Sequence, residues 1–243
     1  MLSTMQSKKG MVSFKKDELL VKIIPDREEM GKVAANEVTA KIIELLDARD
    51  EINMIFAAAP SQNEFIADLI SRPEIDWTRI NAFHMDEYIG LDPEAPQAFG
   101  KFLKIRIFGK VPLKNVFYPV DIVCLGIGEN GHIAFNDPGV ADFNDDKLVK
   151  VADLDMMCRQ QQVNDKCFDE ISDVPTQALT LTIPALLRGK YLYCIVPAIN
   201  KAKAVYNTLN GEITEDCPAT ILRTKENVTL YLDGASSALL DIK

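Results

Sequence analysis

The sequence contains few of the residues that build metal centres, disulfide frameworks and nucleic-acid interfaces. Among 243 residues there are two histidines and five cysteines, and no two cysteines form a CxxC pair. We therefore expect free thiols in a reducing compartment, with no disulfide, zinc site or other metal. The net charge of -9 disfavours nucleic acid and anionic membrane as partners, because binding to phosphate backbones needs a basic face.

Long apolar stretches are also missing. No run approaches the ~18 residues that cross a bilayer, and the N-terminal MLSTMQSKKG lacks the apolar core of a signal peptide. We therefore expect a cytoplasmic protein. The hydrophobic share of 47% is normal for a globular chain, and 243 residues can bury a large core. We expect a single domain over residues 1–243.

Short apolar stretches alternate with segments of helical periodicity. Six stretches have the composition of buried strands: Leu20–Ile24, Ile52–Ala58, Arg79–His84, Ile122–Leu125, Lys190–Val196 and Val228–Leu232. Capping-box patterns at Asp26 with Glu29 and at Ser61 with Glu64 predict two helix starts. Further helices are expected over Phe99–Phe108 and Lys201–Leu209. The alternation predicts an α/β fold with a mostly parallel sheet covered on both faces.

One connection in this scheme is too short. Val116–Tyr118 also resembles a strand, and almost nothing separates it from Ile122–Leu125. Two parallel strands need a crossover of about a dozen residues. Either Val116–Tyr118 is not a strand of the sheet, or a crossover helix is missing from the chain at this point.

The segment LGIGENGHIAFNDP (125–138) raises a choice between a cofactor loop and a catalytic loop. Its glycines, Gly126, Gly128 and Gly131, have the GxGxxG spacing of dinucleotide-binding loops. Such a loop needs a helix directly after the third glycine, and here Pro138 breaks the chain too soon. We therefore expect no nucleotide cofactor.

The alternative is a catalytic loop at the carboxyl end of a central strand. Ligands bind beyond this edge in open parallel sheets. The glycines would present His132, whose imidazole suits proton transfer near neutral pH, with Asn130 and Asp137 beside it. A structural histidine, hydrogen-bonded within a turn, is the other interpretation.

A second polar cluster follows the strand Arg79–His84. Asp86 and Glu87 stand just after this strand, so they should open onto the same sheet edge as His132. A carboxylate and an imidazole are the two groups that proton shuttling on a sugar requires. The alternative is that Asp86 caps the next element and Glu87 is solvated.

Two further places could bind an anion. Ser61, Gln62 and Asn63 stand at an expected helix N-terminus, where free backbone N–H groups attract negative charge. Lys201 opens a helix after a strand, which is unfavourable for a cation unless an anionic ligand lies near. Simple capping by Ser61 and a solvated Lys201 remain open.

Several segments together are similar to known sequences. NAFHMDEYIGL (81–91) and LGIGENGHIAFNDPG (125–139) resemble the glucosamine-6-phosphate deaminase family, with weaker matches at VPTQALTLTIPALL (174–187) and CPATILRT (217–224). The 6-phosphogluconolactonases are more distantly similar. The resemblance implies a three-layer α/β/α sandwich with a Rossmann-like, mostly parallel sheet. It also implies conversion of an amino-sugar phosphate to a keto-sugar phosphate with release of ammonia, without cofactor or metal.

The resemblance assigns roles to individual residues. Asp86 would move the proton between C2 and C1 of the sugar, and His132 would act as acid and base in ring opening. Asn130 and Asp137 would orient His132, and Lys201 would bind phosphate. Glu87 and Gly128, which adjoin these positions, are further expected substrate contacts.

The phosphate loop departs from the family's pattern. That loop is usually Ser/Thr-Gly-Gly-Thr/Ser-Pro, and here it reads Pro-Ser-Gln-Asn-Glu at 60–64. The glycines are replaced by Gln62 and Asn63, and Glu64 adds a negative charge unfavourable for phosphate. Arg159 and Lys166 lie near the position of a family phosphate-binding arginine, so Arg159 is a further candidate substrate contact.

Three other functions stay open. The chain could be a paralogue that acts on a different or unphosphorylated sugar, a 6-phosphogluconolactonase-type hydrolase, or a non-catalytic sugar-binding protein. In each case the expected partner is a small sugar, and homo-oligomerisation is left open.

Overall fold

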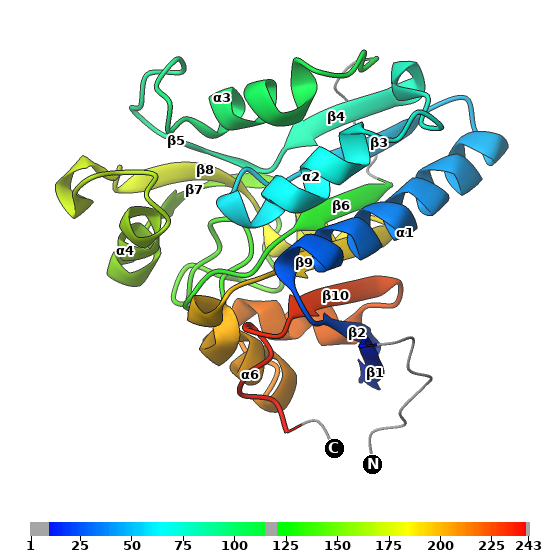
Figure 1. Ribbon diagram of the computed structural model, residues 1–243. Helices are drawn as coiled ribbons and strands as arrows, with labels where there is room; N and C mark the ends of the chain where they lie inside the picture. Colours follow the sequence, from blue (N-terminus) through cyan, green and yellow to red (C-terminus); the bar gives the residue numbers. More distant parts are fainter. Residues whose placement is uncertain (1–9, 115–120, 242–243) are drawn as a thin grey trace.

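The computed structural model describes residues 10–114 and 121–241 (Figure 1). The expected strand Val116–Tyr118 lies outside the described residues, and so does the answer to the crossover question. A seven-stranded sheet forms the centre, in the order β1-β2-β10-β9-β6-β3-β4. Its strands are β1 (Val12–Lys16), β2 (Leu19–Ile24), β3 (Ile52–Phe56), β4 (Ile80–His84), β6 (Ile122–Leu125), β9 (Tyr191–Val196) and β10 (Val228–Asp233).

Six of these strands match the predicted apolar stretches to within a few residues. Each of the six runs parallel to its neighbours among them, and only β1 is antiparallel, to β2. The carboxyl ends of β3, β4, β6 and β9 therefore meet at one edge of the sheet. This is the edge at which open parallel sheets bind their ligands.

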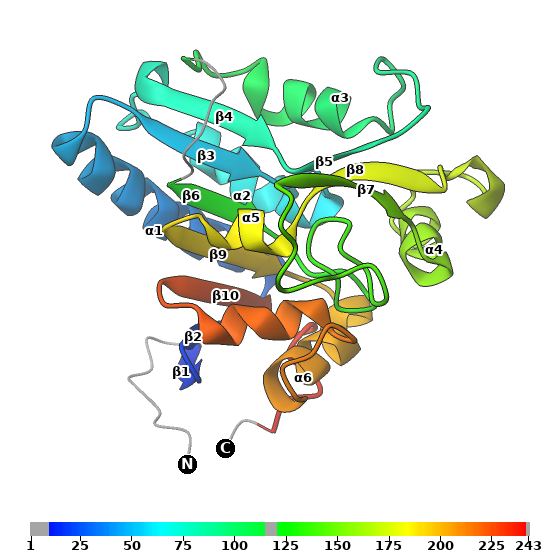
Figure 2. The same cartoon turned by 180° about the vertical axis from the view of Figure 1, so that it is seen from behind.

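Helices cover both faces of the sheet. The helices are α1 (Arg27–Ala48), α2 (Asn63–Ile70), α3 (Phe99–Leu103), α4 (Met156–Asn164), α5 (Ile183–Leu187) and α6 (Ala202–Asn210). α1 and α2 lie over one face (Figure 1), and α5 and α6 lie over the other (Figure 2). Along β3, Met54 and Phe56 belong to the first core and Ile55 to the second. The predicted three-layer α/β/α sandwich is confirmed.

The long helix α1 begins as predicted. Asp26 is its N-cap and accepts a hydrogen bond from the backbone N–H of Glu29 at 2.7 Å. The predicted helix over Phe99–Phe108 is also present, although its second half, Lys104–Phe108, is a π-helix. No helix in the described ranges is long and apolar enough to cross a membrane.

The predicted capping box at Ser61 is wrong. Pro60–Gln62 form a 3-10 turn, and α2 begins only at Asn63, without a side-chain cap. Pro60 favours such a turn because its ring fixes φ. Glu64, the expected second half of the capping box, instead pairs with Arg27 at 2.8 Å.

A second, smaller sheet was not predicted. It consists of three antiparallel strands in the order β5 (Asp86–Tyr88), β8 (Gln177–Leu181) and β7 (Val149–Asp153). Several apolar side chains of β7 and β8 are exposed, so these strands lack the continuous buried pattern of the main sheet. In β5, the backbone of Asp86 pairs with Thr180. This pairing fixes Asp86 at the carboxyl end of β4.

Candidate active site

The loop after β6 carries His132 and packs tightly around it. The backbone N–H of Gly128 donates to the carbonyl oxygen of His132 at 2.9 Å. A Cβ atom at position 128 would lie 2.2 Å from Cε1 of the His132 imidazole, which is closer than any real contact. At Gly131, φ is +90°, and a Cβ atom would lie 2.7 Å from the Sγ of Cys217. Gly128 therefore makes room for the imidazole, and Gly131 allows the turn that precedes it.

A buried hydrogen-bond network holds the imidazole in place. The Nδ1 of His132 lies 2.7 Å from Oδ1 of the fully buried Asp137. Asn130 donates to Asp137 at 3.0 Å and to Asp155 at 2.9 Å, and its Oδ1 accepts from the backbone N–H of His132 at 3.1 Å. Since Nδ1 is engaged, Nε2 is the nitrogen that remains for a ligand.

Asp137 is suited to act as an anionic partner of this histidine. Burial alone would raise the pKa of its carboxyl group. The hydrogen bond and the charge of His132, with the hydrogen bond from Asn130, outweigh burial and hold the pKa of Asp137 below its ordinary value. A stable carboxylate at this position accepts from Nδ1 and so fixes the tautomer and orientation of His132.

Asp86 lies at the carboxyl end of β4 in a dry environment. Its residue exposure is 8%. Burial, with a smaller contribution from the negative charge of Glu87, raises the pKa of Asp86 from 3.8 to about 8. A carboxyl group with such a pKa can both accept and release a proton near neutral pH.

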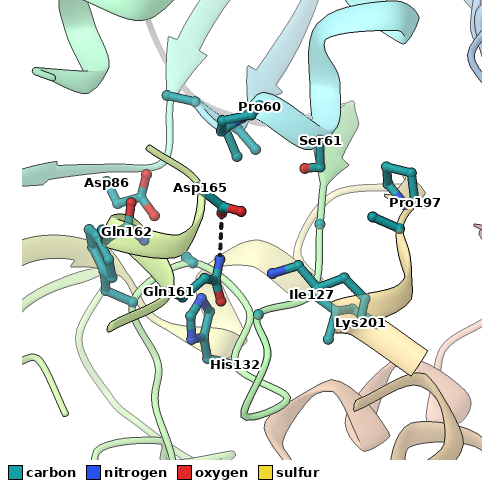
Figure 3. Close-up of a pocket in the computed structure, with 18 of the residues that line it drawn as sticks. Pro60, Ser61, Asp86, Ile127, His132, Gln161, Gln162, Asp165, Pro197 and Lys201 are labelled. Atoms are coloured by element: carbon teal, nitrogen blue, oxygen red, sulfur yellow. Dashed lines mark hydrogen bonds between the residues drawn. The ribbon is translucent and has the colours of Figure 1, made fainter. Parts of the chain in front are cut away.

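One cavity joins Asp86 and His132. It lies at the carboxyl edge of the main sheet and has about 760 Å³ of empty space, including solvent at its mouth. Figure 3 shows Asp86, His132 and Lys201 around the same space. Other lining residues include Arg27, Ser61, Gly128, Gln161, Gln162 and Asp165.

Two strained backbone positions also line the cavity. Ala134 has φ of 49° and Ala198 has φ of 84°, although neither is glycine. Such left-handed conformations cost about 1–3 kcal/mol each and concentrate at functional sites. At Ala198 the backbone N–H is held by the carboxylate of Asp233 at 3.0 Å, which fixes the chain just before Lys201.

Lys201 supplies a positive charge to the cavity from a nearly dry position. Its residue exposure is 5%. Burial lowers the pKa of Lys201, and the negative charges of Asp165 and Glu129 partly oppose this effect. A buried ammonium group that faces a cavity favours an anionic or hydrogen-bond-accepting ligand.

Comparison with known proteins identifies the relatives of this chain. No family model matches it. A glucosamine-6-phosphate deaminase from an Exiguobacterium strain is 34% identical over 192 residues, which cover 70% of this chain and 74% of the relative. One from Streptococcus gordonii is 30% identical over 240 residues, which cover 90% and 97%.

The chain belongs to the glucosamine-6-phosphate deaminase family. Its structure also resembles that of a monomeric glucosamine-6-phosphate deaminase, with a TM-score of 0.81 and 27% identity over 90% of this chain and 99% of that one. A 6-phosphogluconolactonase from Shewanella baltica has a TM-score of 0.73 over 90% of this chain and 99% of that one, but only 14% identity. The lactonase likeness therefore shows the shared fold alone.

In this member of the deaminase family, the divergent phosphate loop contributes Pro60 and Ser61 to the cavity. Ser61 is among the lining residues, whereas Gln62 and Asn63 are not. The amide of Gln62 turns inward and donates to the carbonyl oxygens of Leu125 and Ile195 at 3.5 and 3.3 Å. Gln62 therefore forms hydrogen bonds with backbone groups of β6 and β9 and does not line the cavity.

Glu87 and Arg159 have structural contacts in place of the expected substrate contacts. The carboxylate of Glu87 accepts from the backbone N–H groups of Phe99 and Gly100, at 3.0 and 2.7 Å, at the start of α3. Arg159 donates from α4 to the carbonyl oxygens of Ile171 and Val174, at 2.7 and 2.8 Å. Neither residue lines the cavity, because each is engaged with backbone groups elsewhere.

Several cavity residues were not predicted from the sequence. Arg27 comes from the first turn of α1, and Gln161, Gln162 and Asp165 come from α4 and the residue after it. The buried amides of Gln161 and Gln162 are unusual on a helix, since glutamine is mostly exposed. Such polar residues indicate a binding site only once the helix that carries them is known to be buried.

His132, Asp137 and Cys158 form a cluster in which one potential metal-ligand atom from each lies within 4.8 Å of the others. Burial, followed by the charges of Asp137 and Asp155, raises the pKa of the Cys158 thiol far above its ordinary value. The thiol is therefore protonated, and Asp137 already binds His132. We interpret the cluster as the support of the imidazole and assign no metal to it.

Proposed function

We propose that this chain converts an amino-sugar phosphate of the glucosamine 6-phosphate type into the keto-sugar phosphate, with release of ammonia. Relatives named for this activity support the proposal. The observation that carries it is that Asp86 and His132 line one cavity at the carboxyl edge of the sheet. A protein that only binds sugar needs neither an activated carboxyl group nor an oriented imidazole.

In the proposed reaction, His132 opens the sugar ring. Nε2 takes the proton of the hydroxyl group at C1 and returns a proton to the ring oxygen as the C1–O5 bond breaks. Asp137 stabilises the imidazolium ion that exists between these two transfers. The product of this step is the open-chain aldehyde.

Asp86 then moves a proton between neighbouring carbons. Its carboxylate removes the proton at C2 while the aldehyde oxygen O1 takes a proton from the ammonium group at C2, which gives an enolamine, and Asp86 then delivers its proton to C1. The resulting iminium ion at C2 adds water and expels ammonia, which leaves the ketone. One amino-sugar phosphate and one water molecule thus become one ketose phosphate and one ammonia. The overall step has no net redox change and needs no cofactor.

The pKa of Asp86 sets a condition on this mechanism. Since that pKa is about 8, only about one tenth of the free enzyme carries the carboxylate at pH 7. The ionised base should become more abundant as the pH rises, so kcat/KM should rise between pH 6 and 8. A base whose pKa lies near the working pH remains effective, because its conjugate acid can return the proton.

Ammonia release from a panel of sugars tests the proposal. The panel comprises glucosamine 6-phosphate, galactosamine 6-phosphate and the two free amino sugars, each incubated with the wild-type protein and with His132→Gln. We expect ammonia from glucosamine 6-phosphate and its loss in the variant. Absence of ammonia from all four sugars, or full activity of His132→Gln, would overturn the proposal.

A further inference from the structure

The end of the cavity near Lys201 carries both signs of charge. Among the described lining residues, the cations are Lys201 and Arg27, and the carboxyl groups are those of Asp86 and Asp165. The guanidinium group of Arg27 is already engaged, by Glu64 at 2.8 Å and by the carbonyl oxygen of Pro60 at 2.6 Å. Lys201 is therefore the cation left to meet an anionic ligand, and Asp165 shares its space.

Asp165 is held at this position by the protein. It follows the last residue of α4, and its backbone N–H donates to the carbonyl oxygen of Gln161 at 2.8 Å. Its Oδ2 accepts from Nε2 of Gln161 at 3.3 Å, and Oε1 of Gln161 accepts from the backbone N–H of Glu129 at 2.8 Å. This chain of hydrogen bonds links Asp165 to the loop that carries His132. Figure 3 shows Asp165 and the end of the Lys201 side chain facing the same space.

The charge of Asp165 acts on Lys201 more than any other charge does. Of the charges that oppose the effect of burial on the pKa of Lys201, Asp165 is the largest and Glu129 the second. Glu129 does not line the cavity. Its carboxylate accepts hydrogen bonds from the side-chain amides of Asn200 at 2.7 Å and Asn164 at 3.4 Å. Asp165 is half-buried and faces the cavity, so an incoming ligand meets it directly.

We propose that Asp165 is a specificity-determining residue that disfavours a phosphate dianion at Lys201 and so narrows the preference of the site for phosphorylated over free amino sugars. The inference rests on the proposed function, because it concerns the substrate of the same cavity. A phosphate group at Lys201 competes with Asp165 for the ammonium ion and is repelled by the carboxylate. A sugar hydroxyl group is not repelled, and it can donate a hydrogen bond to Asp165.

Binding of inorganic phosphate tests the inference without turnover. Isothermal titration calorimetry at pH 8 and constant ionic strength compares the wild type with Asp165→Asn and Asp165→Ser. We expect the Kd for phosphate to fall about tenfold in both variants, the scale of one charge interaction in a partly solvated site. Asp169→Asn is the matched control: Asp169 is exposed, lines only an adjoining cavity and carries the same charge.

Kinetics supply a second readout. In Asp165→Asn, KM for glucosamine 6-phosphate should fall about tenfold. KM for glucosamine should change much less, because the side-chain oxygen of asparagine still accepts a hydrogen bond from a sugar hydroxyl group. The inference is overturned if the phosphate Kd changes less than twofold in both variants, if Asp169→Asn has the same effect, or if no form binds phosphate at 50 mM. If the wild type releases no ammonia from any sugar, the proposed function fails, and the phosphate Kd values still decide the role of Asp165.

Discussion

Replacing Asp86 with asparagine should stabilise the protein, by an amount that grows with pH. The carboxyl group has its ordinary pKa of 3.8 in the unfolded chain and a pKa of about 8 in the folded one. Below pH 3.8 it is protonated in both states, and its titration has no effect on stability. As the pH rises, the unfolded chain loses this proton while the folded chain keeps it, so the unfolded state becomes progressively favoured. Asparagine has the same shape and does not titrate, so the stability of the variant does not decrease in this way as the pH rises.

The size of the effect follows from the two pKa values. Each pH unit corresponds to about 1.36 kcal/mol. Ionisation of Asp86 in the unfolded chain therefore lowers the free energy of unfolding by about 1.6 kcal/mol at pH 5 and about 5 kcal/mol at pH 8. The stability gained by Asp86→Asn should therefore increase by about 3.5 kcal/mol between these two pH values. For a chain of this length, that difference corresponds to roughly 7–14 °C in Tm.

Thermal unfolding of both proteins at pH 5, 6, 7 and 8 measures this increase. Packing and hydrogen-bond differences between the two side chains do not depend on pH, so they cancel in the comparison. Asp146→Asn, at an exposed aspartate, controls for the loss of one negative charge. Turnover of Asp86→Asn should fall by more than 100-fold over the same range, because general base catalysis contributes about 10²–10⁴-fold. A Tm difference that stays constant from pH 5 to 8 would refute the argument from burial.

The remaining predictions concern the histidine loop, α4 and the start of α1. Gly128→Ala should lower kcat at least tenfold, because its methyl group would displace the imidazole of His132; kcat equal to wild type would contradict this. Arg159→Ala should lower the free energy of unfolding by about 1–3 kcal/mol, by removing bonds to Val174 and its neighbours, with KM unchanged. A raised KM would instead indicate that Arg159 contacts the substrate. Asp26→Ala should cost about 1 kcal/mol in urea unfolding, and no change would exclude its capping role.

The main sheet could be predicted from the sequence because its strands are buried on both faces. A strand such as β6 (Ile122–Leu125) is a continuous apolar run, and few other structures produce this pattern. β7 and β8 gave no such signal, since Val151 and Leu179 are exposed at 54% and 47%. The second sheet forms through antiparallel pairing of short strands, and that pairing depends on contacts distant in the chain.

The candidate site was predictable where a residue lies in the segment that follows a parallel strand. His132 and Asp86 follow β6 and β4, and the parallel topology brings both strand ends to one edge. Asp165 follows no strand of the main sheet; it enters the cavity because α4 folds over that edge. The placement of α4 is a tertiary property that local sequence patterns do not encode.

Polar side chains near a site posed a different difficulty. Gln62, Glu87 and Arg159 have the chemistry of substrate contacts, but each bonds buried or helix-terminal backbone groups. Irregular segments near strand ends leave many such groups without partners, and unsatisfied groups are costly. Sequence alone does not distinguish a side chain that binds a ligand from one that completes the backbone.

The GxGxxG segment shows why environment decides what such spacing means. In a dinucleotide loop, the second glycine lets a cofactor's pyrophosphate approach the backbone. Here the same missing Cβ atom at Gly128 accommodates the imidazole of the chain's own His132, 2.2 Å from where that atom would be. A side chain at this position would disturb catalysis before it disturbed ligand affinity. Substitutions in this loop should therefore change kcat more than KM. Substitutions near Lys201 should change mainly KM.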